Sequence, residues 1–382
     1  MTDAPSSDRT NSGRLDAILS HFLREGFIRH EPSLLQPASV FLDRLGEDFR
    51  GRLYLTSDAR GRELCLRPEF TIPVCLDYLA SSKAGEPAAF AYGGAIFKAG
   101  AEGGGELPQA GLESFGRDDR EAADAEILAV ALEAARAAGA RGLEVRLGDA
   151  GLAAAFLDQL ALPPVWRRRL VTGRARGQSL AAIFSPATKN GREGAGVLAA
   201  LEKVDHADAR KLVEDLLSIA GVSTVGGRGA AEIAERFLEQ ATLKAGDGVP
   251  KEKRALAEAF FSVEGAPDAA SAALRRLMDD AKLDLAQALD SLDTRSSFIA
   301  ARGLALDDMT FCASFARRLD YYSGFVFEAR RARMRQGAPV IGGGRYDRLL
   351  KTLGAARDIP AVGAAIWVDR LEGDDLLKGD LA

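Results

Sequence analysis

The order of hydrophobic and polar positions divides the chain into a strand-rich beginning, a helical middle and a strand-rich end. Leu15–Arg24 and Phe70–Ala80 have the spacing of amphipathic helices, and Asp119–Ala138 is an Ala-rich helix of the same kind. Short apolar runs bounded by turn residues predict strands. These runs are Leu53–Leu55, Glu63–Leu66, Ala88–Phe97, Gln109–Gly116 and Leu143–Leu147.

After residue 150 the pattern changes to Ala-, Leu-, Glu- and Arg-rich segments of helical period, with few β-branched runs. Strand patterns return near Met309 and continue as far as residue 366, at Thr310–Ala316, Gly324–Ala329 and Ala361–Ile366. A last helix is expected from about Trp367. Strands followed by helices and then by strands again favour an α+β domain that is interrupted by a helical one.

We therefore expect a discontinuous core made of residues 15–150 and 300–373, with a mainly helical insertion at 151–299. Residues 1–14 are polar and rich in Ser, Thr and Asp, so we expect a disordered tail there. Residues 374–382 are expected to form a C-terminal tail.

Composition narrows the class of protein. The 382 residues carry a net charge of −5, which gives no support for a nucleic-acid partner. No apolar run approaches the roughly 18–20 residues of a membrane span, and the polar start does not resemble a signal peptide, so we expect a cytoplasmic protein. Three scattered cysteines favour reduced thiols, and three dispersed histidines without ligand spacing predict no metal site. They are Cys65, Cys75, Cys312, His21, His30 and His206.

Leu66-Arg67-Pro68-Glu69-Phe70-Thr71 places a carboxylate and a hydroxyl two positions apart at a strand-to-helix junction. Glu69 and Thr71 are therefore candidates for holding an ammonium group. An ordinary helix start explains the same pattern, because a carboxylate near a helix N-terminus is favoured by the helix dipole alone.

Gln109, Gly111 and Glu113 share one face if their segment is a strand, with the glycine leaving room between the two polar side chains. This arrangement predicts a polar pocket, although an exposed sheet face gives the same pattern. Tyr322 and Tyr346 offer apolar walls with a hydrogen-bonding tip, which suits an imidazole, or they are core tyrosines. Arg317 is a candidate for a carboxylate, or a surface charge.

These motifs occur in an order that resembles the histidyl-tRNA synthetase family of class II aminoacyl-tRNA synthetases. Pro32 matches the motif 1 proline, and Leu66–Thr71 resembles the family's Leu-Arg-Pro-Glu-x-Thr. The later matches are Phe97-Lys98 with Gln109–Gly116 for motif 2, Arg317–Glu328 and Gly343–Asp347 for the two histidine signatures, and Ala361–Arg370 for motif 3. The resemblance covers residues 15–373 and implies an antiparallel sheet flanked by helices.

The chain departs from that family at the positions that hold ATP. Motif 2 of the synthetases reads Phe-Arg-x-Glu, whereas this chain has Lys98 and Gly100 in place of the arginine and the glutamate. Lysine keeps the positive charge but lacks the planar guanidinium group with which an arginine binds a phosphate through two hydrogen bonds. Motif 3 normally presents Gly-x-Glu-Arg, whereas here Trp367 and Asp369 precede Arg370. We expect a degenerate ATP site, and no anticodon-binding domain because the sequence ends soon after motif 3.

The positions that face histidine in the synthetases are retained. They are Glu69, Thr71, Gln109, Glu113, Arg317, Tyr322 and Tyr346. Together with the departures, this resembles the family of regulatory subunits of short-form ATP phosphoribosyltransferase. The resemblance implies no catalysis, no cofactor and no tRNA. It also implies a dimer that joins the short catalytic subunit in a hetero-octamer and makes that enzyme sensitive to histidine as effector.

Two alternatives remain at this point. One is a histidyl-tRNA synthetase that lacks its anticodon domain, and the other is a synthetase-like ligase that acts on another acceptor. Both need ATP, so pyrophosphate exchange driven by histidine distinguishes them from a regulatory subunit. The sequence leaves open whether histidine binds in the synthetase-like pocket or at the interface with the catalytic subunit.

Overall fold

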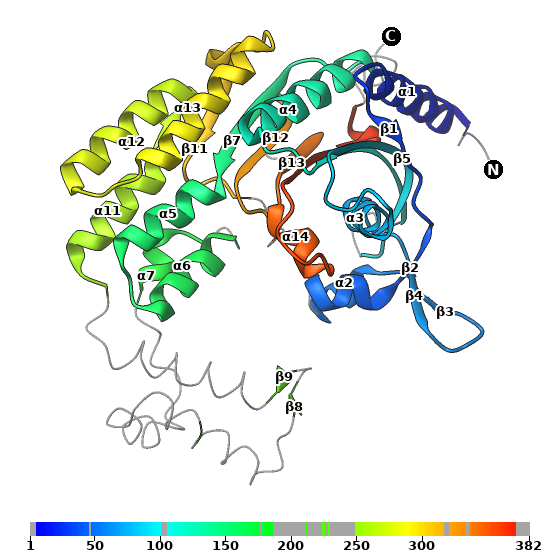
Figure 1. Cartoon of the computed structure of the whole chain (residues 1–382), viewed down its shortest axis with the longest axis horizontal. Coiled ribbons are helices and arrows are strands. Elements are labelled where there is room, and N and C mark those ends of the chain that lie inside the picture. The colour runs from blue at the N-terminus through cyan, green and yellow to red at the C-terminus, as the bar shows by residue number, and fades with distance from the viewer. Residues whose placement is uncertain are drawn as a thin grey trace, which may run out of the picture. The chain divides into compact units, whose positions relative to one another are not determined.

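The computed structural model describes residues 5–45, 47–100, 105–175, 178–185, 211, 224–225, 228–229, 249–316, 321–332 and 337–371. The chain divides into two compact units, one of Met1–Phe156 with Phe260–Ala382 and one of Leu157–Ala259. The predicted C-terminal tail, 374–382, lies outside the described residues. Figure 1 shows the elements of the chain.

The described helices and 3-10 turns of the first unit lie on both sides of the second unit in the sequence. They are α1 (Pro5–Arg24), α2 (Ala38–Leu45), η1 (Glu47–Arg52), α3 (Thr71–Ala80), α4 (Arg120–Ala137), α12 (Pro267–Ala281), α13 (Ala286–Ala301), η2 (Leu306–Asp308), α14 (Asp347–Thr352) and η4 (Val368–Leu371). Two helices, α5 (Ala150–Leu160) and α11 (Lys251–Ser262), cross the boundaries between the units. The second unit contains α6 (Pro164–Ala175), α7 (Leu180–Phe184), β8 (Thr224–Val225) and β9 (Arg228–Gly229).

The described strands of the first unit form a nine-stranded and a three-stranded sheet. The large sheet has the order β1-β5-β6-β14-β13-β12-β7-β11-β10, and the small sheet has the order β2-β4-β3. Their bounds are β1 (Ile28–Arg29), β2 (Leu35–Pro37), β3 (Leu55–Ser57), β4 (Glu63–Leu66), β5 (Ala88–Lys98), β6 (Gly105–Phe115), β7 (Leu143–Asp149), β10 (Glu264–Gly265), β11 (Met309–Cys312), β12 (Phe325–Arg331), β13 (Ile341–Arg345) and β14 (Ala361–Trp367).

The six neighbouring strands from β5 to β7 in this order pair antiparallel, which confirms the predicted α+β fold with an antiparallel sheet flanked by helices. Parallel pairs occur only towards the two ends of the described sheet, between β1 and β5 and between β7 and β11. The central strands also carry the residues of the pocket described below.

Two glycines allow the central strands to approach closely enough to form this sheet. A Cβ atom on Gly343 would lie 2.4 Å from the carbonyl oxygen of Gly363 and 2.6 Å from the ring of Phe327. A Cβ atom on Gly363 would lie 1.6 Å from a carboxylate oxygen of Glu113. No larger residue fits at either position without displacing a strand or that carboxylate.

Helices α1 and α4 pack against each other and against the large sheet, as Figure 1 shows. The many buried alanines of α4, such as Ala129 and Ala131, let its axis approach β6, β13 and β14. The prediction of a disordered tail at 1–14 is wrong for residues 5–14, which belong to α1. Pro5 stands at the first helical position, where its missing N–H costs no hydrogen bond.

A buried ion network joins α13 to α4 and to β13. Asp124 of α4 is fully buried and accepts hydrogen bonds at 2.9 Å from Arg295 Nε and from Arg345 Nε. Arg295 also donates to Asp149, and Arg345 to Asp347, both at 2.9 Å. Arg345 of the glycine-rich motif is therefore a structural residue, and each buried charge has an opposite partner.

This network corrects the predicted bounds of the insertion. Residues 151–299 were expected to form one helical insertion, whereas the separate unit comprises Leu157–Ala259, and α12 and α13 belong to the core unit. The reason is that Arg295 anchors α13 on α4. Helical periodicity identifies a helix but does not tell on which body the helix packs.

None of the described helices combines the length and the apolar character that a membrane crossing requires.

Candidate functional site

A pocket of about 260 Å³ lies between the N-terminal end of α3 and strands β5, β6, β13 and β14. The structure brings five of the seven predicted histidine-facing residues to its wall: Glu69, Thr71, Gln109, Tyr322 and Tyr346. Residues that are far apart in the sequence therefore form one site. Arg317 lies outside the described residues.

Glu69 lines the pocket and also caps α3, so the helix-start interpretation of this residue is confirmed. Its carboxylate oxygens accept the backbone N–H groups of Thr71 at 2.8 Å and Ile72 at 2.9 Å. Burial raises the pKa of Glu69 to about 7, against the lowering effect of these two hydrogen bonds. Lys98 acts in the lowering direction as well. Glu69 is thus a positioned acceptor whose charge depends on what binds beside it.

Glu113 lies behind the pocket wall and is held by two tyrosines. It is 1% exposed, and its carboxylate accepts hydrogen bonds from the hydroxyl of Tyr92 at 3.2 Å and from the hydroxyl of Tyr346. Burial raises the pKa of Glu113 to about 8, with the hydrogen bond from Tyr346 opposing the shift. Glu113 therefore does not line the pocket, although a direct contact with a bound ring would require it to. It is connected to the pocket by its hydrogen bond with the Tyr346 hydroxyl.

Tyr92 and Gly363 belong to this arrangement but were missed from the sequence. Tyr92 is paired with Gly111 across β5 and β6, and a Cβ atom on Gly111 would lie 2.2 Å from the Tyr92 hydroxyl oxygen. Gly363 leaves the space that the Glu113 carboxylate fills. The signal that identifies Tyr92 in the sequence is a tyrosine opposite a glycine in a predicted hairpin. Gly363 can be identified only when the register of the strands is known.

We expect the ligand-free protein to lose stability as the pH rises from about 5 to about 8. The pKa of Glu113 is raised from 4.5 to about 8, so between these values the folded state holds a proton that the unfolded state releases. The contribution of this proton to the stability of the folded state is complete below the pKa of the unfolded state. It is lost as the pH rises through the pKa of the folded state.

Melting temperatures between pH 5 and pH 8 measure this effect. Glu113→Gln cannot ionise, so its melting temperature should fall less over this range than that of the wild type. Glu63→Gln is a matched control, because Glu63 is an exposed glutamate paired with Arg50. The melting temperature of Glu63→Gln should fall with pH as steeply as that of the wild type. A wild-type slope in Glu113→Gln would contradict the prediction.

Two residues of the expected degenerate ATP site, Lys98 and Trp367, line the same pocket. Burial lowers the pKa of Lys98, and the charge of Arg370 adds to this lowering. Trp367 lines the pocket at the end of β14, where it is paired with Gln109. Arg52, which sequence reasoning missed, adds a second cation to the wall.

The other residues of that group do not contribute to the pocket wall. The Arg370 guanidinium stacks 4.6 Å from the Trp367 ring centroid and donates to the carbonyl oxygen of Pro339 at 2.8 Å. Asp369 Oδ1 is buried and makes no hydrogen bond within the described part of the chain. A Cβ atom on Gly100 would meet no atom of the described residues within 4 Å.

Comparisons with known proteins identify the family of this chain. A histidyl-tRNA synthetase family model matches residues 4–226 and 209–371. An ATP phosphoribosyltransferase regulatory subunit of Brucella anthropi is 40% identical over 97% of this chain and 98% of its own length. The subunit of the same name from Brucella canis is 40% identical over 90% of this chain and 92% of its own length.

Two solved structures share the fold. A protein from Bacillus halodurans, described as an ATP phosphoribosyltransferase regulatory subunit/histidyl-tRNA synthetase, has a TM-score of 0.69 at 21% identity and is matched over 80% of its length by 97% of this chain. The histidyl-tRNA synthetase from Nostoc has a TM-score of 0.66 at 18% identity, with 100% of this chain and 75% of that chain covered. The chain belongs to the family of ATP phosphoribosyltransferase regulatory subunits, within the histidyl-tRNA synthetase-like proteins.

Proposed function

We propose that this chain is the non-catalytic regulatory subunit of a short-form ATP phosphoribosyltransferase, which is needed for the first step of histidine biosynthesis and for feedback inhibition by histidine. One observation carries the proposal. Five of the residues that the resemblance assigns to histidine line one pocket. Lys98 and Trp367 line it too, at positions where the resemblance implies an arginine that binds phosphate with two N–H groups and a glycine that leaves space for ATP. The names of the Brucella relatives support the same assignment.

A histidine zwitterion needs a partner for each polar group that leaves water. Glu69, Thr71 and Gln109 would accept hydrogen bonds from its ammonium group, because all three line the pocket and carry oxygen acceptors. The imidazole would lie against Tyr322 and Tyr346, with Glu113 fixing the Tyr346 hydroxyl. Arg317, assigned to the carboxylate by resemblance, completes the set.

We also propose a homodimer that forms a hetero-octamer with the catalytic subunit, without tRNA and without a cofactor, in the cytoplasm. The motif 1 region supports self-association, since Ile28, Leu34 and Leu35 are exposed by 57%, 47% and 49%. An apolar surface of this kind is typical of an interface between subunits. The three buried free cysteines fit a reducing compartment.

We expect a dimer in isolation and a larger complex after the short catalytic subunit is added, as measured by light scattering and native mass spectrometry. Leu35→Lys should weaken the dimer, because it places a charge in an isologous contact that both copies share. Phe298→Lys, at an exposed apolar residue of α13, is the matched control and should remain dimeric. A monomeric wild type whose mass does not change with the catalytic subunit would contradict the proposal.

The alternative functions remain testable against this one. A histidyl-tRNA synthetase without an anticodon domain, or a ligase for another acceptor, would activate its substrate with ATP. Neither is favoured by the lowered pKa of Lys98 or by the indole of Trp367 in the pocket.

A further inference from the structure

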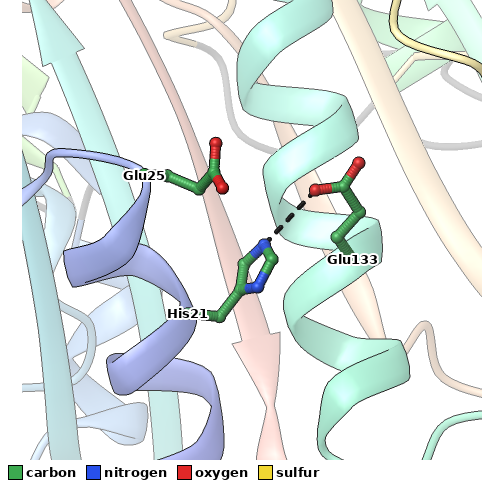
Figure 2. A group of neighbouring side chains, drawn as sticks. All are labelled: His21, Glu25 and Glu133. Carbon is green, nitrogen blue, oxygen red and sulfur yellow. Dashed lines mark ion pairs between the residues drawn. The ribbon is translucent and has the colours of Figure 1, made fainter.

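A histidine and two glutamates meet where the last part of α1 packs against α4. Glu25 directly follows α1, and its backbone N–H donates to the carbonyl oxygen of His21 at 3.1 Å, so the two residues are one helical turn apart. Glu133 reaches them from α4. One donor atom from each residue lies within 4.8 Å of the other two. Figure 2 shows the three side chains turned towards a common space. None of them lines the pocket described above.

The contact between His21 and Glu133 differs from an ordinary histidine–carboxylate pair. Nε2 of His21 lies 3.3 Å from Oε2 of Glu133, yet Nε2 is buried and makes no hydrogen bond to any described residue. Elsewhere in the chain, His30 Nε2 makes a direct hydrogen bond of 2.8 Å with Asp77. Two ligand atoms on one tetrahedral zinc ion lie roughly 3.3–3.6 Å apart, from ligand distances of about 2.0–2.2 Å. The 3.3 Å between His21 and Glu133 matches that arrangement, and the carboxylate of Glu25 lies within 4.8 Å of both ligand atoms.

We propose that His21, Glu25 and Glu133 bind one divalent transition-metal ion, for which Zn²⁺ is the best match, with water at the remaining positions. One imidazole nitrogen and two carboxylate oxygens form a ligand set that suits zinc. Glu25 is exposed, so the ion can enter from solvent. The bound ion fastens the end of α1 to α4 and neutralises the two carboxylates that it brings together.

Arg24 provides an internal check on this geometry. Its exposed guanidinium lies 3.5 Å from Nδ1 of His21. A metal on Nε2 leaves the imidazole proton on Nδ1, so the guanidinium has to turn away when the ion binds. Arg24→Ala is therefore expected to tighten zinc binding, although it removes no ligand.

The test is a zinc titration of the untagged, full-length chain after treatment with a chelator, followed by calorimetry and by competition with a chromogenic chelator. We expect one equivalent in the wild type and an affinity at least about tenfold lower in Glu25→Gln, Glu133→Gln and His21→Ala. Glu25→Gln changes an exposed side chain, so it preserves the fold. His30→Ala is the matched control, because it removes a histidine paired with a carboxylate elsewhere, and it should bind as the wild type does.

A second measurement separates a site from non-specific binding. Zinc should raise the melting temperature of the wild type and of His30→Ala but not that of Glu25→Gln, because only a ligand of the folded state stabilises it. A wild type that binds no zinc, or a Glu25→Gln variant with wild-type affinity, would overturn the proposal. The three side chains would then form only an ion pair between two helices.

Discussion

Histidine-dependent exchange of pyrophosphate into ATP is expected to be absent, at least about 10²–10³-fold below the rate of a histidyl-tRNA synthetase. Adenylation needs preorganised charge at the α-phosphate. Lys98 lacks the bidentate fork of an arginine, and burial lowers its pKa, so the charged form is weakened. Trp367 lines the pocket at the position where the synthetase resemblance implies a glycine that leaves space for ATP. The measurement is exchange of labelled pyrophosphate, with a histidyl-tRNA synthetase assayed under the same conditions.

Single variants test whether both differences prevent exchange. Trp367→Gly opens the pocket without restoring the arginine, and Lys98→Arg restores the fork without opening the pocket. We expect neither change alone to produce exchange, because each leaves one obstacle in place. Pyrophosphate exchange by the wild type at an ordinary synthetase rate would contradict the regulatory assignment and favour one of the ATP-dependent alternatives.

Glu113→Gln and Tyr322→Phe are each expected to raise the half-inhibitory histidine concentration of the reconstituted enzyme about tenfold or more. Each change leaves a buried polar group without its full partner, which costs about 1–3 kcal/mol. Glu113 fixes the Tyr346 hydroxyl, and Tyr322 lines the pocket directly. Inhibition curves with the short catalytic subunit measure the effect.

The same variants should still activate the catalytic subunit if histidine binds in this pocket as we propose, because the pocket is then distinct from the contact with that subunit. Tyr54→Phe is the matched control, since Tyr54 is 41% exposed and does not line the pocket. It should leave inhibition unchanged. Unchanged half-inhibitory concentrations in both Glu113→Gln and Tyr322→Phe would move the histidine site to the interface between the two subunits.

Local patterns predicted the elements that build the core. Alternation and turn residues located β4 at Glu63–Leu66 as the structure has it, and β5 and β14 within one residue at each end. Side-chain period and the position of glycines are properties of the local chain, so these elements needed no knowledge of their neighbours. The order of the motifs then indicated the synthetase-like fold, which the structural comparisons confirm.

Packing decided which elements belong together. The helices at 267–301 have the same Ala- and Leu-rich pattern as the insertion, but Arg295 pairs with Asp124 and places α13 in the core unit. A buried ion pair joins residues that no local pattern relates, so only the tertiary structure fixed this boundary. The start of α1 at Pro5 was missed for a different reason. Its first turns are polar, so they lack the periodic apolar residues by which an amphipathic helix is identified.

The sequence by itself, through its resemblance to the synthetases, predicted seven histidine-facing residues, of which Glu69, Thr71, Gln109, Tyr322 and Tyr346 line one pocket. The tertiary structure decided how they act. It placed Glu113 behind Tyr346 and enclosed it with Tyr92, in space that Gly363 leaves open. It also brought Glu133 to His21, where the sequence predicts no metal site. The physical reason is that strand register and helix packing, which local patterns do not specify, determine which side chains share a buried space.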